Sequence, residues 1–240
     1  MYKLWDALES AKKLKWVELS HSLNNDSPYW SGIPEGSVEL GKVVFDWGNP
    51  MLECQIQTFK FPGHFIQGAP RSESYGVMDG VFPLCVVDIT EKVKADCHYA
   101  ATAQDIKDYE AKYGPIPDGA FVALRTDWSK NWPDMNALSG IAEDGSENFP
   151  GWSLDALRYI YDVRNAAANG HAALDTDASA EAAKAGDLAC ERYVLEKGKL
   201  QVEVLQNLDQ VAPAGAVLFV AWPRFHGAVG LPVRVWAITE

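Results

Sequence analysis

Residues 84–126 read LCVVDITEKVKADCHYAATAQDIKDYEAKYGPIPDGAFVALRT, and this stretch decides the fold. Leu84–Ile89 is a continuous apolar run of strand length, which is typical of a buried strand. A helix is predicted next, with Thr102 as its N-cap and Gly114 at its end. A second apolar strand, Ala120–Thr126, follows it. This order of strand, helix and strand favours an α/β fold.

The flanking sequence adds more strands than helices. In the helix that begins at Thr102, Asp105 completes a capping box with Thr102. Ile106, Tyr109 and Tyr113 form one apolar stripe along it. We therefore expect mixed β-sheets with helices packed between and around them. The other predicted elements are a helix at Leu4–Ala11, strands at Val17–Leu19, Val38–Trp47, Leu52–Phe61, Leu200–Leu205, Ala216–Trp222 and Pro232–Thr239, and a helix opened by Ser153.

Length and composition favour one globular domain over residues 1–240, with a short helix inside residues 1–15. The chain has 240 residues, 48% of them hydrophobic, and a net charge of −12. Such a charge opposes binding to nucleic acid or to an anionic membrane. No apolar run approaches the ~20 residues of a membrane helix, and the N-terminus lacks the apolar core of a signal peptide. We expect a cytoplasmic protein with reduced cysteines.

The histidines are the first candidates for chemistry. His21, His98 and His226 have no partner pattern in the sequence and fit structural roles as well as catalytic ones. His64 is the strongest candidate, because Pro62 and Gly63 end a predicted strand with residues that rigidify and open the backbone for a projecting side chain.

Two glutamates inside otherwise apolar segments are the second candidates. Glu191 follows Cys190, and Glu203 ends the stretch Leu200-Gln201-Val202. A carboxylate in such a place is costly unless it is paired or bound to a metal. Each is therefore either a metal ligand or a member of an ion pair at a solvated edge. The acidic cluster of Asp175 and Asp177 is a weaker signal of the same kind.

Short segments between Trp16 and the C-terminus occur in a characteristic order and spacing. Each one alone is a weak signal, and the series as a whole is specific. The segments are Val17–His21, Ser27–Gly32, Pro62–Gly68, Leu84–Ile89, Leu124–Lys130, Pro150–Ser153, Leu174–Asp177, Gln206–Asp209 and Leu231–Arg234.

In this order the segments resemble the cyclase-like metal-dependent hydrolases, a family that includes kynurenine formamidase and isatin hydrolase. The resemblance implies a swivelling β/β/α fold and hydrolysis of a cyclic or N-formyl amide, as in arylformamidases of tryptophan catabolism. It also implies a divalent metal, zinc or manganese, a small-molecule substrate, and a homodimer or homotetramer. His64 corresponds to the acid/base position, and Glu191 and Glu203 correspond to a second pair of metal ligands.

The sequence departs from the family signature H-x-G-T-H-x-D-x-P-x-H at the metal triad. Aligned without a gap from His64, the three ligand positions carry Cys54, Thr58 and Lys60. The alternative is a deletion of about ten residues at Phe61. Either alignment predicts impaired hydrolysis and leaves two functions open: a weak amidohydrolase with a remodelled metal site or no metal, and an inactive ligand-binding or structural protein. An aromatic cleft near Trp30, Phe65 and Trp152 is expected to hold a planar ligand.

Overall fold

The computed structural model describes residues 2–29, 32–34, 36–46 and 53–240. Trp30 lies outside these residues, as do Trp47 and Leu52 at the inner ends of the predicted hairpin. The strands are β1 (Lys15–Glu18), β2 (Val38–Asp46), β3 (Glu53–Phe59), β4 (Val81–Asp88), β5 (Ala100–Ala101), β6 (Phe121–Arg125), β7 (Gly151–Trp152), β8 (Ala168–His171), β9 (Leu200–Val202), β10 (Ala216–Ala221) and β11 (Arg234–Thr239).

Helices lie between most of these strands, and several of them are short. Single turns of 3₁₀ helix occur at Ser72–Ser74, Val77–Gly80, Trp128–Asn131 and Leu208–Gln210, and a π-helical turn at Tyr159–Val163 extends α5. The α-helices are α1 (Lys3–Ala11), α2 (Thr90–Ala95), α3 (Ala103–Tyr113), α4 (Met135–Ser139), α5 (Leu154–Arg158), α6 (Ser179–Ala185) and α7 (Ala189–Glu196).

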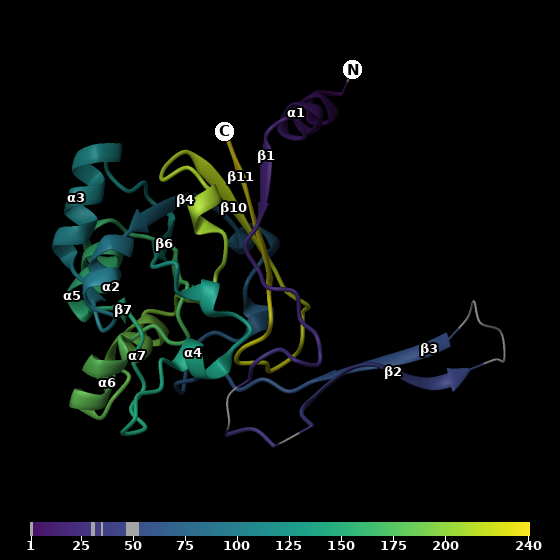
Figure 1. Ribbon diagram of the computed structural model, residues 1–240. Helices are drawn as coiled ribbons and strands as arrows, with labels where there is room; N and C mark the ends of the chain where they lie inside the picture. The colour runs from purple at the N-terminus through teal and green to yellow at the C-terminus, as the bar shows by residue number, and fades with distance from the viewer. Residues whose placement is uncertain (1, 30–31, 35, 47–52) are drawn as a thin grey trace.

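One large mixed sheet organises the molecule. Its order is β1-β11-β10-β4-β6-β8-β9, with β4, β6, β8 and β9 parallel and the other pairs antiparallel (Figure 1). The α/β class with mixed sheets is therefore confirmed. The stretch chosen from the sequence supplies the centre of this sheet, because β4 and β6 pair in parallel from Leu84 with Phe121 to Asp88 with Arg125.

The centre of the sheet is buried on both faces. In β4, Cys85 and Val87 point into a core beneath the helices, whereas Leu84 and Val86 point into a second core on the opposite face. Because both faces are covered, β4 reads as a continuous apolar run instead of an alternating one. The structure begins β4 at Val81, three residues before the predicted start.

Helix α3 begins with the capping box that the sequence predicted. Thr102 accepts a hydrogen bond from the backbone N–H of Asp105, and the Asp105 side chain accepts one from Thr102 in return. Ile106 and Tyr109 are buried as predicted, but Tyr113 is 40% exposed. The ring centre of Tyr113 lies 5.1 Å from that of Tyr109, so the stripe continues to the end of the helix, where its last member is open to solvent.

The predicted hairpin exists and leaves the main body of the protein. β2 and β3 pair only with each other, from Val38 with Phe59 to Asp46 with Glu53. In Figure 1 they reach away from the helices. The chain then returns to the large sheet through residues 60–80, which carry His64.

Four parallel strands set the position of the candidate site. β4, β6, β8 and β9 all run in one direction, so their carboxyl ends share an edge of the sheet. Ligands of open α/β folds bind outside this edge. β9 ends at Val202, so Glu203 lies just beyond the strand and not within it as predicted. Within the described residues, no helix is both long and apolar enough to cross a membrane.

Candidate functional site

His64 lies on a loop that packs closely against the Val229 side chain and the Gly230 backbone. A Cβ on Gly63 would lie 2.9 Å from Val229 Cγ2 and 3.0 Å from the backbone nitrogen of Gly230. Glycine therefore permits the close approach that places the next residue. The imidazole of His64 is half exposed, and its Nδ1 lies 3.0 Å from Glu191 Oε1.

Glu191 stands in the first turn of α7, and its side chain is only 5% exposed. The carboxylate of Asp177 accepts hydrogen bonds from the backbone N–H groups of Cys190 and Glu191, both at 2.9 Å. These are the donors that a helix start leaves without partners inside the helix. Asp177 thus anchors the turn from which Glu191 reaches His64.

A second chain of hydrogen bonds reaches Glu191 from β9. The hydroxyl of Thr176 donates to Gln201 Oε1 at 2.8 Å, and Gln201 Nε2 donates to Glu191 Oε1. The same carboxylate oxygen therefore receives Gln201 and His64. The other oxygen, Glu191 Oε2, is buried and has no hydrogen-bond partner among the described residues.

The structure brings together the three residues that the sequence proposed as catalytic or metal-binding. One ligand atom each of His64, Glu191 and Glu203 lies within 4.8 Å of the others. The residues come from a loop, a helix and the end of β9, so only the fold places them side by side. Glu203 itself is partly buried.

Negative charge accumulates around His64. Burial and the nearby Glu191 raise the pKa of Asp175 to about 6, and burial raises the pKa of Asp177. Burial, Glu191 and Asp175 raise the pKa of Glu203 well above its ordinary value. In turn, the hydrogen bond to Glu191 raises the pKa of His64, although burial opposes it. Like charges held this close favour protonation or a bound cation.

His171 lies at the end of β8 and is fully buried. Neither ring nitrogen has a hydrogen-bond partner in the part of the chain that the structure describes. Burial lowers its pKa to about 4, and Glu191 opposes that shift only in part, so the ring is neutral at pH 7. Because Glu191 acts on its pKa, this uncharged ring lies near the carboxylates of the site.

The donor set fits a divalent cation. Imidazole nitrogen and carboxylate oxygen suit Zn²⁺ and Mn²⁺, and Glu191 Oε2 is an orphaned buried acceptor that a cation would satisfy. Glu191 and Glu203 would hold the ion, and positive charge would relieve the repulsion among the carboxylates. The gapless alignment of the family signature places Cys54 and Thr58 on β3, outside this cluster.

Of the three aromatic residues proposed for substrate binding, the two that the structure describes do not line a common open cleft. Trp30 is outside the described residues. Phe65 follows His64, is 36% exposed, and has the guanidinium of Arg71 3.7 Å from its ring centre. Trp152 is fully buried, and its ring belongs to the helix-side core instead of an open wall.

The remaining histidines lie elsewhere. His21 stacks on Trp132 with ring centres 4.3 Å apart, and burial lowers its pKa to about 4. His226 is almost fully exposed beside Glu73. Cys190 is an inert thiol, because it is buried, donates to the carbonyl of Trp152, and has its pKa raised by burial.

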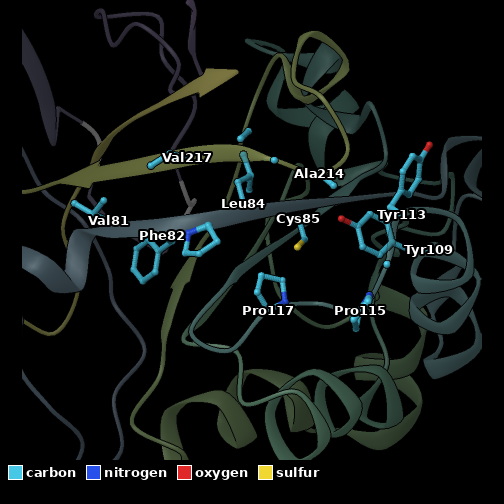
Figure 2. Close-up of a pocket in the computed structure, with 14 residues that line it drawn as sticks. Val81, Phe82, Leu84, Cys85, Tyr109, Tyr113, Pro115, Pro117, Ala214 and Val217 are labelled. Carbon is cyan, nitrogen blue, oxygen red and sulfur yellow. The ribbon is translucent and has the colours of Figure 1, made fainter. Parts of the chain in front are cut away.

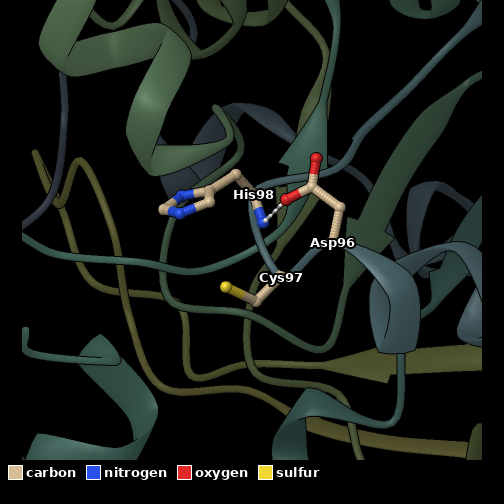
Figure 3. Close-up of side chains that lie close together, drawn as sticks. All are labelled: Asp96, Cys97 and His98. Carbon is tan, nitrogen blue, oxygen red and sulfur yellow. Dashed lines mark hydrogen bonds between the residues drawn. The ribbon is translucent and has the colours of Figure 1, made fainter.

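A second group of metal-ligating side chains follows α2. The side chains of Asp96, Cys97 and His98 lie close together on one turn (Figure 3). One carboxylate oxygen of Asp96 already accepts the backbone N–H of His98 at 3.0 Å. These three consecutive residues make a tight turn, and no side chain from another element joins the group within the described residues.

An apolar cavity of about 380 Å³ is separate from the site. It lies at the start of β4, between the end of α3 and the beginning of β10 (Figure 2). Tyr109, Tyr113 and Phe82 line it, and none of the carboxylates around His64 does. The cavity therefore contributes nothing to the chemistry of His64.

Comparison with known proteins identifies the family of the chain. The family model Cyclase matches residues 17–178, more than half of the chain. The chain belongs to this cyclase family. Isatin hydrolase of Roseibium aggregatum is 28% identical over 184 residues, covering 75% of this chain and 69% of the relative.

Solved structures show the same fold. An isatin hydrolase bound to the product analogue thioisatinate superposes with a TM-score of 0.86 at 23% identity, covering 100% of this chain and 99% of that one. Isatin hydrolase A from Ralstonia solanacearum gives a TM-score of 0.85 at 24% identity, with coverage of 100% and 98%. In sequence and in fold, this cyclase-family chain is similar to hydrolases.

Sequence reasoning missed Gln201. It lies in β9, two positions before Glu203, and an uncharged amide there gave no signal of its own in the sequence. Asp175 and Asp177 had been noted only as a weak acidic cluster.

Proposed function

We propose that this chain hydrolyses a cyclic or N-formyl amide, in the manner of an isatin hydrolase or arylformamidase, with weak activity. The observation that carries the proposal is the convergence of His64, Glu191 and Glu203 at the carboxyl edge of the sheet. The names of the relatives support a hydrolase. The choice of a small aromatic amide as substrate rests on that similarity alone.

The residues have separable roles in this reaction. With Glu191 as acceptor, His64 carries a hydrogen on Nδ1, so Nε2 is free to exchange a proton with the leaving nitrogen. Glu191 and Glu203 would hold a divalent cation, which polarises the amide carbonyl and acidifies water when bound. Glu191 thus both orients the imidazole and contributes to the charge of the metal site.

Weak activity follows from the altered triad. A well-coordinated ion lowers the pKa of water from 15.7 to about 7, which raises the hydroxide fraction at neutral pH by roughly eight to nine powers of ten. A general base alone contributes about 10²- to 10⁴-fold. Cys54, Thr58 and Lys60 do not reproduce two histidines and an aspartate, so turnover depends on how well the two glutamates replace them.

The same substitutions favour an alternative, a protein that binds a planar ligand without chemistry. The two proposals differ in the metal content and the turnover that they predict. Metal analysis and assays with isatin and N-formylkynurenine should show bound Zn²⁺ or Mn²⁺ and turnover that His64→Asn abolishes. His226→Asn is the matched control, since that ring is almost fully exposed and remote from the cluster. Absence of both metal and His64-dependent turnover would support the alternative.

Self-association and a cytoplasmic location belong to this proposal. Helix α1 buries none of its residues, and Leu4, Trp5 and Leu8 are exposed at 79%, 62% and 47%. An apolar helix face of this kind is typical of an interface. We expect a homodimer or homotetramer by light scattering, and a dimer weakened by Trp5→Glu. A wild-type monomer would contradict the expectation.

A further inference from the structure

Gln201 occupies a particular place in the site. Its amide links Thr176, which donates to its oxygen, with Glu191, which accepts from its nitrogen. Val202, the next residue, is buried in the core on the sheet face opposite the helices. Because side chains alternate along a strand, Gln201 is directed to the other side, where α7 presents Glu191.

The chemistry of an amide suits this place. Glu191 Oε1 needs donors, and the surroundings already contain Asp175, Asp177 and Glu203. A carboxylate at position 201 would add another negative charge, and an aliphatic side chain would leave the oxygen with one donor fewer. Glutamine donates a hydrogen bond without adding charge.

Thr176 fixes which way the amide faces. Its hydroxyl donates to Gln201 Oε1, so the nitrogen is turned toward Glu191. Rotation of the amide by half a turn would place its oxygen against the carboxylate and lose the second bond. Thr176 and Gln201 together therefore determine the position of Glu191 Oε1.

We infer that Gln201 is a positioning residue, which holds Glu191 against His64 so that the neutral imidazole keeps its hydrogen on Nδ1 and presents Nε2 to substrate. A hydrogen bond to one ring nitrogen decides the tautomer of histidine. The tautomer requires only the contacts described here. Its effect on turnover rests on the proposed function.

The test compares two glutamine variants that lose the same kind of bond. Gln201→Leu removes the donor to Glu191. Gln206→Leu, the matched control, removes an amide donor to the carbonyl of Ser20 and touches neither His64 nor Glu191. The tautomer of His64 is read by ¹⁵N NMR of the histidine-labelled protein above the pKa of this residue, with the signal assigned through His64→Asn.

Wild type and Gln206→Leu should show mainly the Nδ1–H form, and Gln201→Leu a mixture of tautomers. If wild type turns over isatin or N-formylkynurenine, kcat should fall roughly 10- to 100-fold in Gln201→Leu with little change in KM, as for other residues that orient a reacting side chain through one contact. An unchanged tautomer in Gln201→Leu would overturn the inference.

A second variant keeps the test decisive if Gln201→Leu does not fold. Thr176→Val keeps the glutamine but frees its amide to rotate, and it should shift the tautomer in the same direction by a smaller amount. No shift in folded Thr176→Val would then refute the role of the linked amide. A wild type without turnover would sink the proposed function and leave the NMR result intact, so the two failures can be told apart.

Discussion

Asp177 caps the helix that presents Glu191, although the two residues belong to different elements. Its carboxylate oxygens accept the backbone N–H groups of Cys190 and Glu191 at 2.9 Å each. An acidic group there also interacts favourably with the helix dipole. The position of Glu191 in the site therefore depends on the carboxylate of Asp177, which holds the start of α7.

Removing this cap should affect both the stability of the protein and the position of His64, whereas removing another helix cap should affect stability alone. Asp177→Ala should lower the free energy of unfolding by about 1–2 kcal/mol, the usual cost of losing a helix cap, and also weaken the contact between His64 and Glu191. Asp134→Ala removes the cap of α4, where Asp134 accepts from Asn136 and Ala137. It should cost similar stability in urea unfolding without affecting the His64 signal. Equal effects of both variants on His64 would show that Asp177 has no specific role.

Titration of His64 provides the second prediction. The hydrogen bond to Glu191 raises the pKa of His64 in the folded protein. The stabilisation from this pair is therefore fully present below the unfolded value, near pH 6.5, and is lost as pH rises through the folded pKa. In an NMR titration, Glu191→Gln should lower the pKa of His64.

The control for this titration lies on the same helix. Glu196→Gln removes an exposed carboxylate of α7 that pairs with Arg192. It should leave the His64 titration where it is in wild type. If the pKa of His64 is the same in Glu191→Gln as in wild type, the 3.0 Å contact between His64 Nδ1 and Glu191 Oε1 is absent in solution.

The sequence predicted the centre of the fold because local and long-range forces agree there. β4 and β6 are apolar runs, and both bonds of the Thr102 and Asp105 capping box form. β8 was missed because Ala168-Asn169-Gly170-His171 lacks branched and aromatic residues. Its place is decided by packing: a Cβ on Gly170 would lie 2.6 Å from the Phe121 ring and 2.8 Å from Leu205.

The site likewise contains residues that local sequence signals predicted and one that they did not. His64, Glu191 and Glu203 were found from an unusual turn, from charges in apolar segments, and from a family resemblance. Gln201 was missed because an uncharged amide in a strand resembles any solvated residue. Its partners come from segments far apart in the chain, so its role depends on tertiary contacts that no local pattern contains.

Cation binding provides the third prediction. Wild type should bind Mn²⁺ or Zn²⁺ by calorimetry, and Glu203→Gln should weaken binding at least about 10-fold. Because burial and Glu191 raise the pKa of Asp175 to about 6, affinity should fall as pH drops through that value. Cys97→Ser tests the Asp96–His98 turn as a competing site. Loss of binding in Cys97→Ser but not in Glu203→Gln would show that the ion binds at the Asp96–His98 turn.

The fourth prediction concerns Gly63. An added Cβ would lie 2.9 Å from Val229 Cγ2 and 3.0 Å from the backbone nitrogen of Gly230, and the backbone atom cannot rotate away. Gly63→Ala should therefore cost about 1–3 kcal/mol of stability, or displace the loop and with it His64. Gly76→Ala is the matched control, because its Cβ would meet only Asp79 Oδ2 at an ordinary 3.5 Å.

Thermal unfolding combined with the His64 NMR signal separates the two outcomes. A displaced loop alters the histidine signal at nearly unchanged stability. A loop held in place lowers the melting temperature and leaves the histidine signal unchanged. A Gly63→Ala protein that matches Gly76→Ala in both measurements would show that the loop does not rest on residues 229–230.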